Sequence, residues 1–182
     1  MPSEINYTEY SQVKLLHKNH FGCEPSAIEP LTSHGSDRTI LRLHAKDSTS
    51  IGIINKHINE NRTFIAFGNH FRKSGINVPE IFNVSDDSYS YLMEDLGDTT
   101  LLREIQKRGA NPFGEKETGL YKKVIEILPE FQVRAGKTID FSFCYQFREF
   151  AEENIRFDLD YFYKRFLQNF HKKSVDINRL QN

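Results

Sequence analysis

A polar segment with a single glycine lies between two short apolar stretches, and its residues are of types that could contact phosphate groups. The segment 32–38 includes Ser33, His34, Gly35, Ser36 and Arg38. If the flanking stretches are antiparallel strands, this segment can fold over a polyphosphate and offer it the backbone N–H groups of Gly35 and Ser36. Small polar residues around one glycine also form ordinary hairpin turns. The segment is therefore a candidate phosphate-binding loop, with a plain turn as the alternative.

A second candidate lies where an apolar stretch runs into a polar connector. Residues 91–98 have the sequence YLMEDLGD. A strand that continues straight into a connector can present a backbone C=O and N–H to the edge of a flat heterocycle such as adenine. A linker between two domains would have a similar composition. The two candidates together, with one predicted helix between them, favour nucleotide binding more strongly than either does alone.

The elements that must position these residues follow from hydrophobic periodicity. Alternating or short apolar runs predict five strands, at 28–31, 39–45, 50–55, 78–84 and 89–94. In the second of them, Leu41 and Leu43 fall on one face, and Arg42 and His44 on the other. A helix is predicted at 7–20, before the first strand. Another helix is predicted between the third strand and the fourth.

The inserted helix has recognisable ends and an apolar stripe. Asn59 or Asn61 can cap its start, and Gly75 stands where a left-handed residue ends a helix. Its stripe consists of Phe64, Phe67 and Phe71. We therefore expect this one helix and the five strands to form a compact unit.

The second half of the chain is predicted to be helical. Thr99 or Thr100 can cap a helix over 101–108, a second helix is expected over 117–134, and a third over 147–170. Pro129 predicts a kink or an early end of the second. Apolar residues of the third recur at helical spacing over 155–170, which indicates a core-facing stripe. The connector is a candidate hinge, so we predict two domains, at 1–95 and 96–182.

Three segments together resemble a known family. They are GSDR at 35–38, FRKSGINVPEI at 71–81 and YLMEDLGDTTL at 91–101. The set resembles the aminoglycoside/choline-kinase-like phosphotransferases, in particular the bacterial branch that includes cell-wall amino-sugar kinases. The resemblance is continuous over 28–105 and looser over 115–170. It implies an α+β, protein-kinase-like fold, with a five-stranded antiparallel N-lobe containing one helix, a hinge, and an incomplete helical C-lobe.

The resemblance also implies a nucleotide site that binds ATP with Mg²⁺. The loop 33–38 would cover the phosphates, and the connector would be the hinge that meets adenine. Kinases pair a lysine on the third strand with a glutamate on the next helix; here Asn55 or Lys56 could face the phosphates, and Glu60 is the nearest glutamate. The residues implied to bind nucleotide are Ser33, His34, Gly35, Ser36, Arg38, Asn55, Lys56, Glu60, Glu94, Asp95 and Leu96.

The catalytic loop of such enzymes has no counterpart in the sequence. None of the seven histidines begins a His-x-Asp-x-x-x-x-Asn pattern. The chain therefore looks like the N-terminal part of a phosphotransferase for a small hydroxyl substrate, a sugar or amino sugar. We expect it to be inactive alone, with no catalytic or metal-binding residue of its own and the Mg²⁺ ligands outside it. The apolar stripe at 155–170 would then be covered by the missing C-lobe or by a partner.

Composition limits the other function classes. Lys and Arg number 24 against 25 Asp and Glu, so a protein devoted to nucleic acid is not expected. The sequence shows no leader, no run long enough to cross a membrane, and two widely separated cysteines, which together favour a cytoplasmic protein. The alternative function is a non-catalytic nucleotide-sensing or partner-binding pseudokinase module. A third is an α+β domain that binds nothing at these segments.

Overall fold

The computed structural model describes residues 7–32, 37–109, 113–149 and 151–169, and only the backbone of residues 7–9. The contacts within the chain group the residues up to Phe143 into one compact unit and those from Cys144 into a second. This grouping does not test the predicted division into 1–95 and 96–182, which stays a prediction.

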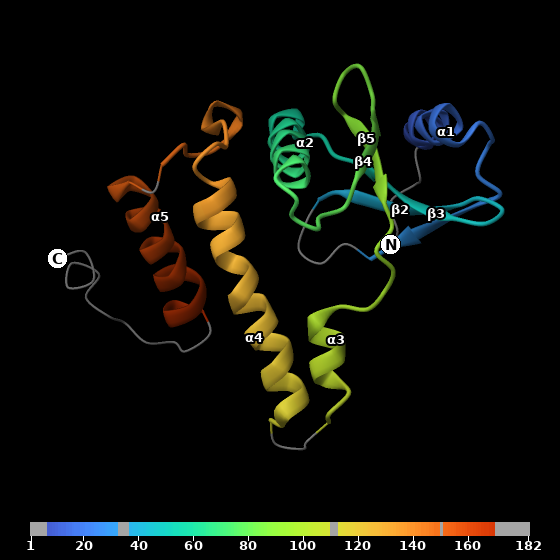
Figure 1. Ribbon diagram of the computed structural model, residues 1–182. Helices are drawn as coiled ribbons and strands as arrows, with labels where there is room; N and C mark the ends of the chain where they lie inside the picture. The colour runs from blue at the N-terminus through green and yellow to red at the C-terminus, as the bar shows by residue number, and fades with distance from the viewer. Residues whose placement is uncertain (1–6, 33–36, 110–112, 150, 170–182) are drawn as a thin grey trace. The chain divides into compact units, whose positions relative to one another are not determined.

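The first unit contains a five-stranded antiparallel sheet with the strand order β1-β2-β3-β5-β4 (Figure 1). The strands are β1 (Ala27–Leu31), β2 (Thr39–His44), β3 (Thr49–Ile54), β4 (Ile81–Val84) and β5 (Ser90–Glu94). One helix stands between β3 and β4 in the chain. The predicted α+β fold class is therefore confirmed. β4 begins three residues later than predicted, because Pro79 has no N–H to donate to a neighbouring strand.

One face of the sheet is covered by the first helix, α1 (Tyr7–Phe21). Val13 and Leu16 of α1 form a buried cluster with Leu41 and Leu43 of β2, as the alternation in that strand predicts. Leu92 of β5 completes the same cluster. This face therefore forms a hydrophobic core with α1.

The opposite face packs against the inserted helix, α2 (Ile58–Lys73). Phe64 of α2 stacks on Tyr91 of β5, with 5.4 Å between the ring centroids. The helix ends as predicted, since Gly75 has a φ of +79°. The predicted cap was wrong: the N-cap residue is His57, and Asn59 and Asn61 lie inside the helix. The His57 backbone N–H donates to Asn55 Oδ1 at 3.1 Å, so the Asn55 side chain, two residues earlier, sets the start of the helix.

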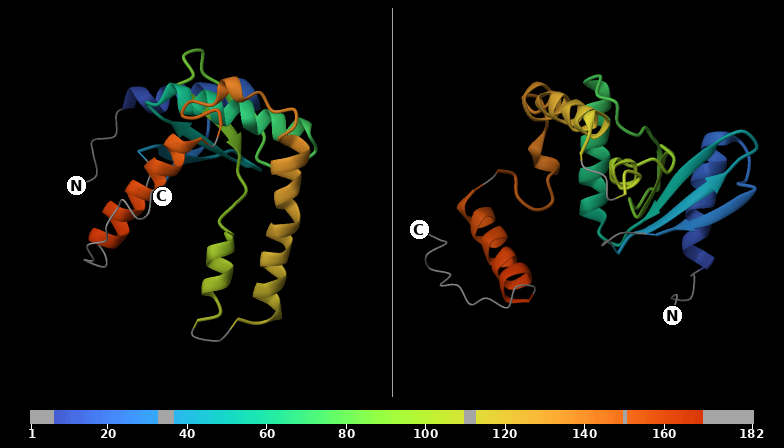
Figure 2. Two further views of the ribbon diagram at one scale, coloured as in Figure 1. Left: turned by 90° about the vertical axis from the view of Figure 1, so that its left-hand side faces the viewer. Right: turned by 90° about the horizontal axis from the view of Figure 1, so that it is seen from below.

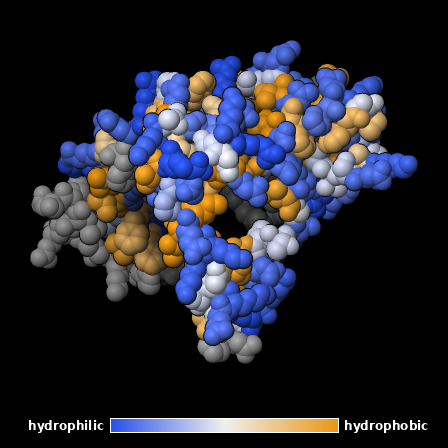
Figure 3. Space-filling view, in the orientation of Figure 1, coloured by the Kyte–Doolittle hydropathy of each residue, from blue (hydrophilic) through white to orange (hydrophobic). Residues whose placement is uncertain are grey.

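Two helices follow the connector. α3 (Leu101–Gln106) begins after Thr100, whose Oγ1 accepts from the Arg103 N–H at 3.1 Å, so one of the two predicted caps is confirmed. α3 packs beside α4 (Glu115–Pro129), as Figure 2 shows. Where one helix was predicted over 117–134, α4 ends at Pro129 and a π-helix, η1 (Glu130–Ala135), continues it. Figure 3 shows apolar side chains at the surface along α4, and Ile125 and Leu128 are among the exposed ones.

The segment that follows α4 packs against the side of α2 that faces away from the sheet. Phe131 packs on Phe71 with 4.9 Å between centroids, and His70 Nε2 lies 2.9 Å from the Ala135 carbonyl oxygen. A short 3₁₀-helix, η2 (Phe141–Phe143), reaches the same side, where Phe141 meets Phe67. The predicted phenylalanine stripe of α2 therefore has two partners, the sheet through Phe64 and this segment through Phe67 and Phe71.

The second unit contains α5 (Glu152–Phe162) and a π-helix, η3 (Tyr163–Gln168). The helix predicted from 147 begins five residues later, after Ala151, whose N–H donates to Asn154 Oδ1 at 3.0 Å. Ile155, Phe162 and Phe166 of the predicted apolar stripe are exposed. Coverage of this stripe by a C-lobe or a partner stays a prediction.

Candidate functional site

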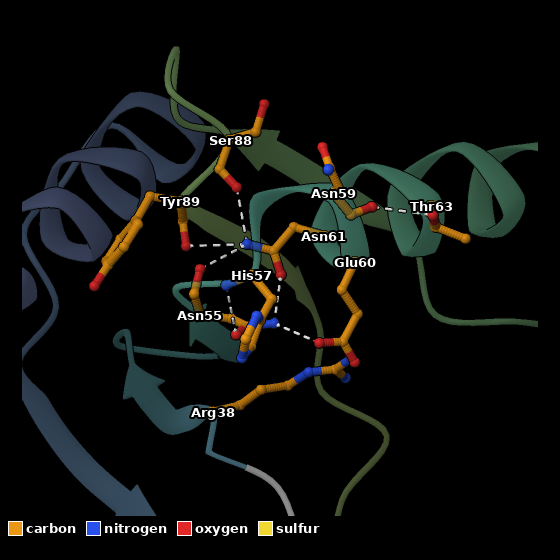
Figure 4. A network of polar contacts seen from close by, with 9 residues as sticks. All are labelled: Arg38, Asn55, His57, Asn59, Glu60, Asn61, Thr63, Ser88 and Tyr89. Atoms are coloured by element: carbon orange, nitrogen blue, oxygen red, sulfur yellow. Dashed lines mark hydrogen bonds and ion pairs between the residues drawn. The ribbon is translucent and has the colours of Figure 1, made fainter. Parts of the chain in front are cut away.

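The α2-facing side of the sheet brings together charged residues from separate parts of the chain. Arg38 immediately precedes β2, and its guanidinium forms an ion pair with Glu60 on the first turn of α2 (Figure 4). Arg38 also lies over the Phe64 ring, 6.0 Å from its centroid. The predicted loop residues Ser33, His34, Gly35 and Ser36 lie outside the described residues. Arg38 is therefore the described residue that marks where this loop rejoins the sheet.

Asn55 holds the carboxylate of Glu60 from the other side. Asn55 is buried at the end of β3, and its Nδ2 donates to Glu60 Oε2 at 3.1 Å. Burial opposes ionisation of Glu60, but this hydrogen bond and the charge of Arg38 outweigh it, so the pKa of Glu60 lies below its ordinary value. The sequence left Asn55 and Lys56 as alternatives; Asn55 faces Glu60, whereas Lys56 is exposed. The cation next to Glu60 is thus Arg38.

Asn61 is an organising residue that the sequence interpretation assigned only as a possible cap. It is fully buried, and its Nδ2 lies 3.1 Å from the Asn55 carbonyl oxygen, 2.8 Å from that of Ser88 and 3.2 Å from that of Tyr89 (Figure 4). Its Oδ1 accepts from Asn55 Nδ2 at 3.1 Å. Asn61 stands three residues before Phe64 and extends the apolar stripe of α2. A polar residue in line with such a stripe is the signal that could have identified it.

A row of apolar side chains lies on the same face of the sheet. Leu31 pairs with Ile40 and Ile40 with Ile53, while Ile51 pairs with Met93 in the next row. Leu31, Ile40 and Met93 are half-buried, because α2 covers only part of this face. The row offers a flat apolar surface of the kind on which a heterocycle can stack.

The connector after β5 forms the other end of this face. Arg42 of β2 forms ion pairs with two connector carboxylates. Its Nε lies 2.7 Å from Asp95 Oδ2, and its Nη2 lies 3.0 Å from Asp98 Oδ1. Burial opposes ionisation of Asp95, but the hydrogen bonds from Arg42, Thr49 and Gly97 together outweigh it and leave the pKa of Asp95 below its ordinary value. Gly97, with a φ of +76°, donates its N–H to Asp95 Oδ1 at 2.8 Å. The connector is therefore a fixed turn.

The other two predicted connector residues differ in their surroundings. Glu94 Oε2 accepts from the Glu80 N–H at 3.1 Å and lies 3.6 Å from Arg72 Nη1. The Glu94 side chain therefore binds the residues next to β4 at the edge of the sheet. Leu96 is 64% exposed, and within the described residues its backbone N–H meets no acceptor. The Leu96 N–H is thus available to a ligand.

The Arg42–Asp95 pair predicts a pH dependence of stability. The folded-state pKa of Asp95 is depressed, so its contribution is complete above about pH 4, the ordinary range of an unfolded aspartate, and is lost as the pH falls through the folded-state value. Urea unfolding of the wild type and of Asp95→Asn at several pH values measures this. The stability difference should stay constant from about pH 5 to pH 8 and shrink below about pH 4. A difference that widens on acidification would contradict the assignment.

No group of three or more His, Cys, Asp and Glu side chains in ranges 7–32, 37–109, 113–149 and 151–169 is placed to hold a metal ion. His17 and His20, which have a possible metal-binding spacing, instead bond to the Cys23 carbonyl oxygen and stack on Phe82, respectively. No described helix is both long and apolar enough to cross a bilayer.

Comparisons with known proteins give likenesses to solved structures. No model of a protein family matches the sequence, and no curated protein matches it. The chain is similar to the crystal structure of a "Putative fructosamine-3-kinase" from Haemophilus somnus 129PT, with a TM-score of 0.42 and 18% sequence identity. The match covers 50% of this chain and 33% of that chain. A likeness at this level carries no argument about activity, so the functional assignment depends on the geometry of the site.

Proposed function

We propose that this chain supplies the nucleotide-binding part of an ATP-dependent phosphotransferase of the aminoglycoside/choline-kinase-like type. The substrate of that enzyme would be a small hydroxyl compound, a sugar or amino sugar. One observation carries the proposal. The Arg38–Glu60 ion pair stands at one end of a half-buried apolar face, and a fixed connector with an available N–H stands at the other. Arg38 and Arg42 lie four positions apart, which in an extended chain separates the two ends by about 13 Å.

Arg38 fits the phosphate-binding role. Phosphoryl transfer depends on a cation that neutralises the phosphates and is itself held by a carboxylate on the neighbouring helix. Glu60, fixed by Asn55, holds the Arg38 guanidinium at the end of the polar loop. A guanidinium has five donors and binds phosphate oxygens in pairs, so Arg38 can serve Glu60 and a phosphate together.

The base would lie between Arg38 and the connector. Ile40, Ile51 and Met93 supply an apolar surface for one side of the ring, and the Leu96 N–H can donate to a ring nitrogen at its edge. Tyr91, on the same face, is buried against Phe64, and this burial raises its pKa to about 12. The face therefore combines a stacking surface, an edge donor and a phosphate cation.

We assign neither the acceptor of the hydroxyl proton nor a Mg²⁺ ligand to this chain. The described residues hold no carboxylate cluster suited to a metal. We expect the isolated chain to bind adenine nucleotides and to show no turnover with a panel of sugars in a coupled ATPase assay. Robust sugar phosphorylation by the 182-residue chain would contradict that expectation.

Arg38→Gln tests the phosphate-binding role. Loss of one charge-assisted contact to phosphate should weaken ADP binding about tenfold, since such hydrogen bonds contribute about 1.5 kcal/mol or more. Titration calorimetry measures this. Arg62→Gln, on the same helix but directed to Ser88, is the matched control and should leave the ADP affinity within about twofold. Equal ADP affinity for Arg38→Gln and the wild type would overturn the assignment.

A further inference from the structure

Arg42 lies on the α2-facing side of the sheet, between one charged neighbour and one apolar neighbour. Its neighbours across β2 are Glu29 of β1 and Ile51 of β3, and its side chain is only 12% exposed. A guanidinium in such surroundings is costly unless it is paired. Arg42 is paired with two carboxylates of the connector, and neither of them lies on β2 or on a strand next to it.

The two carboxylates make unequal contributions to this pairing. Asp95 is 4% exposed and takes two contacts from the Arg42 guanidinium, at 2.7 and 3.2 Å. Asp98 is 63% exposed and also takes two, at 3.0 and 3.3 Å. Asp95 and Asp98 flank Leu96 and Gly97, so one side chain of the sheet fixes both ends of the short turn that carries the Leu96 N–H.

The ion pairs of Arg42 restrict the conformation of this turn. Gly97 adopts a left-handed conformation, and the Leu96 side chain is 64% exposed. Without Arg42, the hydrogen bond from the Gly97 N–H to Asp95 would remain, but Asp95 and Asp98 would lose their common link to β2. The direction of the Leu96 N–H relative to the apolar face would then vary.

We infer that Arg42 is a positioning residue: by gripping Asp95 and Asp98 it directs the Leu96 N–H toward a heterocyclic base stacked on the apolar face. The inference rests on the proposed nucleotide site and adds to it which residue makes the connector competent for base recognition. It predicts that Arg42 acts on the base and Arg38 on the phosphates. The two arginines can therefore be distinguished by the part of the nucleotide each one affects.

The test uses three probes, adenosine, ADP and inorganic tripolyphosphate, with calorimetric affinities for the full chain. Arg42→Gln should weaken adenosine and ADP by the same factor, about tenfold, and leave tripolyphosphate unchanged. Arg38→Gln should do the reverse, weakening ADP and tripolyphosphate and sparing adenosine. This crossed pattern is a readout that general destabilisation would not produce, since a loosened fold would weaken all three probes.

A milder variant keeps the test valid if Arg42→Gln fails to fold because it leaves Asp95 buried without its partner. Asp98→Asn changes an exposed residue and should weaken adenosine about threefold, because one of the two anchors loses its charge. Unchanged adenosine affinity in a folded Arg42→Gln, or in Asp98→Asn where the former is unfolded, would overturn the inference and leave the proposed nucleotide site standing. A wild type that binds neither adenosine nor ADP would overturn both.

Discussion

Asn61→Ala should lower the free energy of unfolding by about 3 kcal/mol, the largest effect that we expect from a single side chain. The substitution removes the Asn61 donor from the carbonyl groups of Asn55 and Ser88, whereas the Tyr89 carbonyl keeps the Asn55 N–H at 3.0 Å. It also removes the acceptor of the Asn55 side chain. Because these groups are shielded from water, each unpaired one carries a desolvation penalty of about 1–3 kcal/mol, part of which local relaxation recovers.

Urea denaturation at neutral pH measures this loss, with Asn59→Ala as the matched control. Asn59 is exposed on the same helix, two residues earlier, so its replacement should change stability by less than about 0.5 kcal/mol. Equal effects of the two substitutions would show that the buried network does not connect α2 to β3 and to the turn before β5. Asn61→Ala should also weaken ADP binding, because Asn55 would hold Glu60 less firmly.

Gly52→Ala should lower the free energy of unfolding by about 2 kcal/mol, through crowding in the core. Gly52 lies in β3 beneath α1, and a Cβ atom there would stand 2.2 Å from Val13 Cγ1 and 2.9 Å from Leu43 Cδ1. Both neighbours are fully buried, so α1 must shift away from the sheet. Thermal unfolding followed by circular dichroism measures the loss as a lower midpoint.

Two further variants distinguish crowding from a general effect of replacing glycine. Gly68→Ala in α2 places its Cβ 3.9 Å from Ile81 and should stabilise the protein slightly, since alanine favours a helix over glycine. The double variant Val13→Ala with Gly52→Ala removes the clashing methyl group and should be less unstable than the sum of the two single variants. Strict additivity would rule out steric conflict between residues 13 and 52.

Much of the fold could be predicted because local patterns agree with tertiary packing. The alternation of Leu41 and Leu43 with Arg42 placed the first pair in the core and the arginine on the other face. The left-handed glycine after α2 marked its end correctly. Boundaries were wrong where a neighbour set them, as at His57, where the Asn55 side chain rather than Asn59 or Asn61 fixes the helix start.

The candidate site was predicted in part. Glu60, Asn55 and Arg38 do meet. The sequence did not reveal that the cation beside Glu60 is Arg38, which precedes β2, because the residues at the end of β3 were the expected partners. Arg42 and Asn61 were missed because their partners lie 53 and 27–28 residues away along the chain. Pairings over such separations depend on sheet register, which no local pattern specifies.

The central claim is that a nucleotide stacks on the α2-facing side of the sheet, between Arg38 and the connector. Methyl NMR of isoleucine- and methionine-labelled protein during an ADP titration tests it most directly. We predict saturable shifts of the Ile40, Ile51 and Met93 methyl groups, with the Ile54 methyl groups of the α1-facing core unchanged. Shifts confined to the α1-facing core, or none at saturating ADP, would contradict the account.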